Sequence, residues 1–175
     1  MRKTMKASLA ALASLALIPA GVTAHTVKAP YTATVTTTTY YSNGNFHGAI
    51  DVSSGSCNYW GVETSVVGSV HWDVTINTSA HYCSTGSGSG NQNEAKHTWA
   101  DGWVFRLWHF NKTASSVDKT CDRCQVGDEG STGNSTGPHT HLQQTRSGTY
   151  DTSWYSGYTT KGEAVDRTET LGVLD

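Results

Sequence analysis

Short runs of β-branched and aromatic residues, separated by glycine and serine, constrain the fold of this chain more than any other feature. No long stretch shows the 3.6-residue periodicity of an amphipathic helix. The clearest runs are YTATVTTTTYYS (31–42), VVGSVHWDVTI (66–76), GWVFRLWHF (102–110) and THLQQT (140–145). We therefore predict an all-β, or β-dominated, sheet with long loops.

Further elements follow from the same pattern. The run around Gly68 predicts a pair of strands, and the composition of 84–93 predicts a flexible loop. The chain after Gln144 is rich in tyrosine, tryptophan, glycine and serine, which predicts a last strand and a loose tail over 147–175.

The first 24 residues have the order of a secretory signal peptide. A basic start is followed by an apolar run from Ala7 to about Ala20, and small residues then lead to Ala24. The run is too short to span a membrane, which takes roughly 20 apolar residues. We expect cleavage near Ala24, export from the cell, and a single domain over 25–175.

The charge of the exported chain disfavours polyanionic partners. Removing the signal takes away three basic residues, so nine basic side chains remain against fourteen acidic ones and the net charge moves from −2 to −5. No run of lysine or arginine remains. We therefore expect no binding to nucleic acid and none to an anionic membrane.

The cysteines predict disulfides, because an even number in an exported chain is typical of disulfide bonding. They are Cys57, Cys83, Cys121 and Cys124. Local loop closure favours Cys57–Cys83 and Cys121–Cys124, although three pairings are possible. The alternative is a zinc half-site at CDRC, which usually needs a second pair of ligands nearby.

Two histidines follow a polar turn in GSTGNSTGPHTHLQQ (130–144). On a strand, His139 and His141 would point the same way with Cα atoms about 6.6 Å apart. The H-x-H spacing is weak evidence alone, but the turn at Gly137 and Pro138 fixes where the strand begins.

A second pair lies upstream in NFHGAIDV. His47 and Asp51 would be about 13 Å apart in a straight strand, too far to share an ion. Gly48 can supply a bend that brings them together. The alternative is a surface histidine and a capping aspartate.

Two histidines and an aspartate would give a metal ion three protein ligands and leave a fourth position open. That is the arrangement of a catalytic rather than a structural zinc site. The remaining histidine of the H-x-H pair is a candidate base or transition-state stabiliser, and His109 in RLWHF is another. The alternative for His109 is a half-buried histidine in an aromatic strand.

HGAID, WHF and GSTGNSTGPHTH, in this order, resemble the lysostaphin-type (LytM-like, M23) zinc metallopeptidases of the secreted β-lytic metalloendopeptidase branch. The resemblance covers roughly 40–146. It implies an antiparallel sheet with an open groove between long loops, and one Zn²⁺ ion per chain. It places the zinc ligands on His47, Asp51 and His141, and the catalytic histidines on His109 and His139.

The sequence departs from this family at three points. The family commonly has H-x-G-x-D, whereas the glycine here comes one place earlier, at Gly48. Thr140 replaces a large apolar residue, and LQQ follows His141 where an aromatic and an acidic residue are frequent. These changes affect the shape of the groove more than the ligand set.

The resemblance implies a secreted zinc metalloendopeptidase that cleaves peptides of the bacterial cell wall through an activated water, and we expect it to be a monomer. One alternative is a non-catalytic or weakly active wall-binding or regulatory module of the same fold. Another is a disulfide-braced β domain without a metal.

Overall fold

A computed structural model describes residues 24–58, 60–88, 90–155 and 157–174. The predicted signal peptide, 1–24, therefore lies almost entirely outside the described residues. Within the described ranges the secondary structure is β-strand without α-helix, which confirms the all-β prediction. No helix in these ranges is long and apolar enough to cross a membrane.

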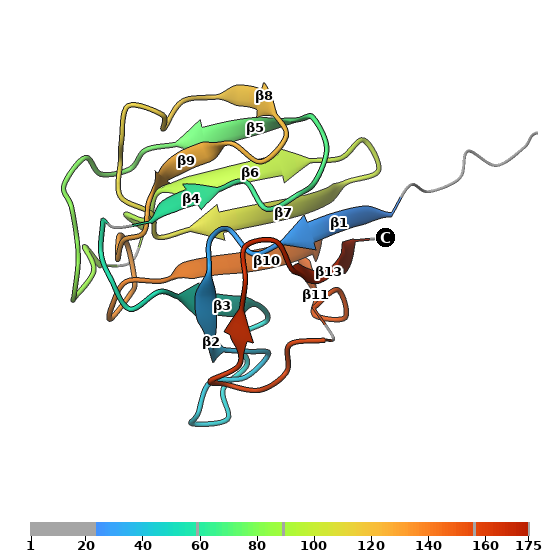
Figure 1. Ribbon diagram of the computed structural model, residues 1–175, viewed down its shortest axis with the longest axis horizontal. Coiled ribbons are helices and arrows are strands. Elements are labelled where there is room, and N and C mark those ends of the chain that lie inside the picture. The colour runs from blue at the N-terminus through green and yellow to red at the C-terminus, as the bar shows by residue number, and fades with distance from the viewer. Residues whose placement is uncertain (1–23, 59, 89, 156, 175) are drawn as a thin grey trace, which may run out of the picture.

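One large antiparallel sheet forms the body of the described chain (Figure 1). Its strands run in the order β12-β2-β3-β10-β7-β6-β5-β8, and β11 pairs with β10. Their bounds are Ala33–Thr37 (β2), Ile50–Ser53 (β3), Val70–Thr75 (β5), Glu94–Thr98 (β6), Trp103–Trp108 (β7), Lys119–Cys121 (β8), Thr140–Arg146 (β10), Thr149–Asp151 (β11) and Ala164–Val165 (β12).

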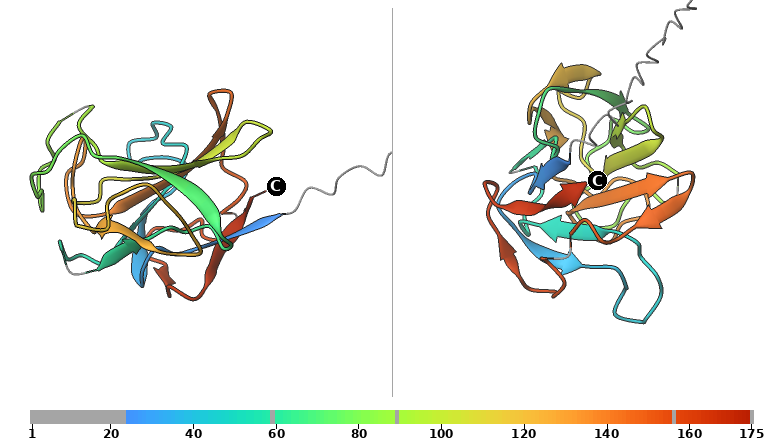
Figure 2. Two further views of the ribbon diagram at one scale, coloured as in Figure 1. Left: turned by 90° about the horizontal axis from the view of Figure 1, so that it is seen from above. Right: turned by 90° about the vertical axis from the view of Figure 1, so that its right-hand side faces the viewer.

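Two short strand pairs cover one face of this sheet. β1 (His25–Lys28) pairs with β13 (Thr170–Leu174), and β4 (Gly61–Glu63) pairs with β9 (Gln125–Asp128). Figure 1 shows them in front of the large sheet, and Figure 2 shows the same arrangement from above and from the side. Val27, Val62 and Leu171 of these pairs join Phe105 and Leu107 of β7 in one buried cluster. The core thus lies between the layers.

The predicted runs around β2, β7 and β10 form strands, whereas the run around Gly68 differs from its prediction. Only β5 forms there, and it pairs with β6 and β8. Val66 makes only an isolated bridge with Val27. The amide of Gly68 donates to Asp122 Oδ1, 2.9 Å away, so this turn is held by another loop and not by a hairpin partner.

The segment predicted as a last strand and a loose tail contains three strands, β11, β12 and β13, and β13 packs into the core. Leu171 and Leu174 are 1% and 2% exposed. A Cβ added at Gly172 would lie 1.5 Å from the carbonyl oxygen of Trp154, so only glycine permits this close approach. The pairing of β13 with β1 and the burial of both leucines therefore fix this segment against the rest of the fold.

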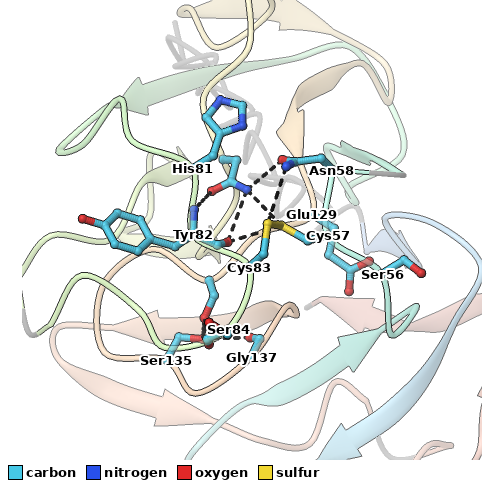
Figure 3. Close-up of a disulfide and its surroundings, with 12 residues drawn as sticks. Ser56, Cys57, Asn58, His81, Tyr82, Cys83, Ser84, Glu129, Ser135 and Gly137 are labelled. Carbon is cyan, nitrogen blue, oxygen red and sulfur yellow. Dashed lines mark hydrogen bonds between the residues drawn. A yellow bond between two sulfur atoms is a disulfide. The ribbon is translucent and has the colours of Figure 1, made fainter.

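The four cysteines form the two locally closed disulfides, Cys57–Cys83 and Cys121–Cys124. Figure 3 shows Cys57–Cys83 close to Glu129 and to the turn that contains Ser135 and Gly137. This disulfide therefore joins two surface loops beside the segment that leads to His139.

Candidate metal centre

Strand pairing places His141 at the centre of the site. In the register of the large sheet, His141 lies opposite Asp51 of β3 on one side and Trp108 of β7 on the other. Residues facing each other across antiparallel strands point to the same side of a sheet. The Trp108 and His141 rings are stacked, with centroids 4.6 Å apart and planes inclined by 7°.

His47 reaches this point because the chain bends at Gly48. The glycine has a φ of 73°, which residues with a side chain rarely adopt. A Cβ there would also lie 2.6 Å from the ring of Tyr150 and 2.7 Å from that of Phe46. The bend brings Nε2 of His47 to 3.2 Å from Oδ1 of Asp51, although the two residues are four apart in sequence.

Three possible ligand atoms form a small triangle. Nδ1 of His141 lies 3.0 Å from Oδ1 of Asp51 and 3.0 Å from Nε2 of His47. All three residues are buried. Ligand atoms of a tetrahedral zinc ion, at bond lengths of 2.0–2.1 Å, lie about 3.3 Å from one another. The spacing and the donor types therefore fit one face of such a tetrahedron.

The outward nitrogens of the two rings have their own partners. His47 donates from Nδ1 to the carbonyl oxygen of Thr38 over 2.8 Å. Nε2 of His141 lies 3.0 Å from Oε1 of Gln143. With the ring protons on these outer atoms, both inner nitrogens present lone pairs to the carboxylate. Three electron-rich atoms at such distances need a positive charge among them.

The pKa values show the same preference for positive charge. Burial would raise the pKa of Asp51, but hydrogen bonds with His141 and His47 hold it well below its usual range. Burial would lower the pKa of His47, but the hydrogen bond and attraction to Asp51 outweigh it, so this pKa is raised. Both shifts favour a positive charge beside the carboxylate of Asp51.

His109 follows β7 directly and has a φ of 77°, which is unusual for a residue with a side chain. This backbone turn brings the ring of His109 to the same side of the sheet as that of its neighbour Trp108. The centroid of the His109 ring lies 4.6 Å from that of His139 and 5.9 Å from that of His141. Its Nδ1 donates to the carbonyl oxygen of Thr132 over 2.6 Å, which leaves Nε2 as an acceptor. Burial, with repulsion from His139 and His141, lowers its pKa to about 3.

His139 is presented by the glycine-rich turn just before β10. Its backbone pairs with Gly130, and Nδ1 donates to the carbonyl oxygen of Gly137 over 2.9 Å. Nε2 lies 3.9 Å from Oδ2 of Asp51. The side chain is 17% exposed, so its ring can exchange protons with solvent.

The loop 84–93 supports this turn. Gly86 donates its amide hydrogen to the carbonyl oxygen of Ser135 over 2.7 Å, and Gly88 donates to that of Gly133 over 3.0 Å. A Cβ at Gly86 would lie 2.1 Å from the Gly133 carbonyl oxygen, so this position requires glycine. The segment predicted to be a flexible loop is a loop, but its backbone is hydrogen-bonded to the turn beneath it.

Glu129 ties the end of β3 to the same turn. Its carboxylate is fully buried and accepts hydrogen bonds from Ser53 Oγ, 3.0 Å away, and from the backbone and hydroxyl groups of Ser54. Ser53 Oγ also lies 2.5 Å from the carbonyl oxygen of Pro138. The segments that carry Asp51 and His139 are therefore linked through the side chains of Glu129 and Ser53.

A groove opens over the five histidine and aspartate side chains. Most of its other lining is polar and uncharged, with Lys161 as a charged exception, and the uncharged residues include Asn43, Asn45, Asn134, Thr36 and Thr136. Tyr41 stands at its edge with its ring centroid 4.6 Å from that of His47.

The structure thus brings together all five predicted site residues: His47, Asp51, His109, His139 and His141. Sequence reasoning missed Tyr41, Glu129 and Gln143. Only Gln143 had a readable signal, because it lies two residues after His141 on a predicted strand and so faces the same way.

No family model and no curated protein sequence matches the chain. Among solved structures, the chain is similar to the catalytic domain, in mutant form, of the prophage-encoded M23 protein EnpA from Enterococcus faecalis. The identity is 20% and the TM-score 0.45, over 78% of this chain and 90% of that one.

Two other solved structures are similar. A zinc-containing peptidase from Vibrio cholerae has 17% identity and a TM-score of 0.45, over 73% of this chain and 39% of that chain. The catalytic domain of the antimicrobial peptidase lysostaphin from Staphylococcus simulans has 21% identity and a TM-score of 0.38, over 77% and 88%.

At such identities a function has to be argued from the side chains of the site. By the HGAID, WHF and GSTGNSTGPHTH motifs, the chain resembles the lysostaphin-type (M23) zinc metallopeptidases.

Proposed function

We propose that the protein is a zinc metallopeptidase that hydrolyses peptide bonds of the bacterial cell wall outside the cell. The observation that carries this proposal is the triangle formed by Nε2 of His47, Oδ1 of Asp51 and Nδ1 of His141, with edges of 3.0 to 3.2 Å. Two imidazoles and one carboxylate suit zinc, and three protein ligands leave a position for water or substrate.

A zinc ion bound there would supply a water of lowered pKa and polarise the carbonyl of the scissile bond. Neutral His109 can only accept a hydrogen bond through Nε2, since its Nδ1 proton is used by Thr132. We assign His109 the role of orienting the attacking water. Its pKa of about 3 makes it a weak proton acceptor at neutral pH.

We assign to His139 the role of taking the proton from the attacking water. Its Nδ1 is held by Gly137, which directs Nε2 towards the carboxylate of Asp51. Once protonated, Nε2 can donate a hydrogen bond to the developing oxyanion or pass the proton to the leaving amine.

The groove and the sequence support the choice of substrate. Amide and hydroxyl side chains such as Asn43, Asn45 and Thr36 can pair with the backbone groups of an extended peptide. Peptides of the bacterial cell wall follow from the resemblance to lysostaphin-type enzymes, and export follows from the signal-like first 24 residues.

The test is digestion of purified cell walls by the zinc-loaded protein, with new termini identified by mass spectrometry. We expect new amino termini that disappear with a chelator and return with zinc. A protein that binds walls and zinc but releases no new termini would instead be a binding module.

Two variants separate the roles of the histidines. His141→Ala should lose both zinc and activity. His109→Asn should keep stoichiometric zinc and lose turnover by roughly 10²-fold, the scale expected when a reacting water is no longer correctly placed. Asparagine is chosen because it tolerates the positive φ at this position. Full zinc retention by His141→Ala would contradict the ligand assignment.

A further inference from the structure

The ring of His141 is restrained in two independent ways. Stacking on Trp108 fixes the plane of the imidazole, because the two rings are nearly parallel. The indole is itself anchored, since its Nε1 donates to Oε2 of Glu94 over 2.6 Å. Stacking alone would still allow a half-turn about the Cβ–Cγ bond. This rotation keeps the plane of the ring but exchanges Nδ1 and Cδ2 at the inner position.

Gln143 supplies the second restraint. It follows His141 by two residues on β10, so both side chains project from the same face of the strand. Its Oε1 lies 3.0 Å from Nε2 of His141, and its side chain is almost fully buried. An amide oxygen can only accept a hydrogen bond, so it places the ring proton on Nε2.

We infer that Gln143 is a positioning residue for the metal ligand His141, holding its ring in the tautomer that presents Nδ1 to the ion. This inference rests on the proposed zinc site. Outer partners of this kind orient ligating histidines and increase their basicity, and their loss typically costs 10- to 100-fold in metal affinity.

The chain provides a matched control in the next residue. Gln144 is equally buried but projects from the opposite face of β10, and within the described residues its Oε1 has no hydrogen-bond partner. Replacing either glutamine by methionine removes an amide of similar size from the same strand. Only the change at Gln143 removes a partner of His141.

Zinc affinity, measured by competition with a chromogenic chelator, tests the inference without using activity. We expect Gln143→Met to bind zinc 10- to 100-fold more weakly than the unaltered protein. Gln144→Met should bind it within about threefold. Gln143→Glu keeps the acceptor and adds negative charge, so it should bind zinc at least as tightly as the unaltered protein.

Two results would overturn the inference: equal zinc affinity in Gln143→Met and the unaltered protein, or equal losses in Gln143→Met and Gln144→Met. If Gln143→Met fails to fold, ¹⁵N NMR of the unaltered zinc-loaded protein decides, because it should show the His141 proton on Nε2. A proton on Nδ1 would overturn it. Absence of zinc binding by the unaltered protein would instead contradict the proposed function.

Discussion

His109 shows how a single residue couples backbone strain to chemistry. A positive φ in a residue with a side chain costs of order 1–3 kcal/mol and persists where the surrounding structure enforces it. Here the backbone amide donates to Asn93 and the ring to Thr132, so both ends of the residue are held. The strained backbone aims the imidazole into the groove.

The buried, neutral state of His109 predicts a pH effect on stability. Its pKa is about 3 in the folded protein and about 6.5 in an unfolded chain. At a pH between these two values, His109 binds a proton in the unfolded state but not in the folded state, so acid destabilises the fold. This contribution to stability is complete above pH 6.5 and is lost as the pH falls towards 3.

Urea unfolding of the metal-free protein at several pH values measures this effect. We expect the free energy of unfolding to fall between pH 6.5 and 4, and to fall less steeply in His109→Asn, which cannot take up that proton. Parallel pH curves for the two proteins would show that His109 does not titrate as described.

At the scale of elements, two of the three proposed metal ligands lie on strands, whereas His47 and the two proposed catalytic histidines lie outside them. Asp51 and His141 belong to β3 and β10, whereas His139 depends on the turn that loop 84–93 and Cys57–Cys83 support (Figure 3). Loss of this disulfide should therefore disturb the turn while the metal ligands stay in place.

The two disulfides provide a matched comparison. In the chain-entropy model, cross-linking across 26 positions stabilises by about 3.5 kcal/mol and across 3 positions by about 1.6 kcal/mol. We expect Cys57→Ser/Cys83→Ser to lower Tm more than Cys121→Ser/Cys124→Ser. The first should also lower kcat with zinc still bound. Equal kcat in both double variants at a permissive temperature would contradict the supporting role.

Some of the site was predictable from short motifs. Gly48 was expected to bend the chain before Asp51, and its positive φ does so. The pairing of Asp51, His141 and Trp108 across three strands was not predictable, because register depends on contacts between residues 33 and 90 positions apart. Glu129 was missed for the same reason, since its partners, Ser53 and Ser54, are distant in sequence.

At the scale of the whole molecule, the class of fold was predictable but its closure was not. Alternating β-branched residues indicate strands wherever they occur. The burial of Leu171 and Leu174 depends on the pairing of β13 with β1, two strands far apart in the sequence, which no local pattern encodes. The prediction of a loose tail failed at this level.

The proposed site requires one ion shared by residues from three segments of the chain. The most direct measurement is anomalous diffraction at the zinc absorption edge from crystals of the zinc-loaded protein. We predict one peak per chain, about 2.0–2.2 Å from Nε2 of His47, Nδ1 of His141 and a carboxylate oxygen of Asp51. Crystals that show no peak among these atoms, or zinc only at other histidines, would contradict it.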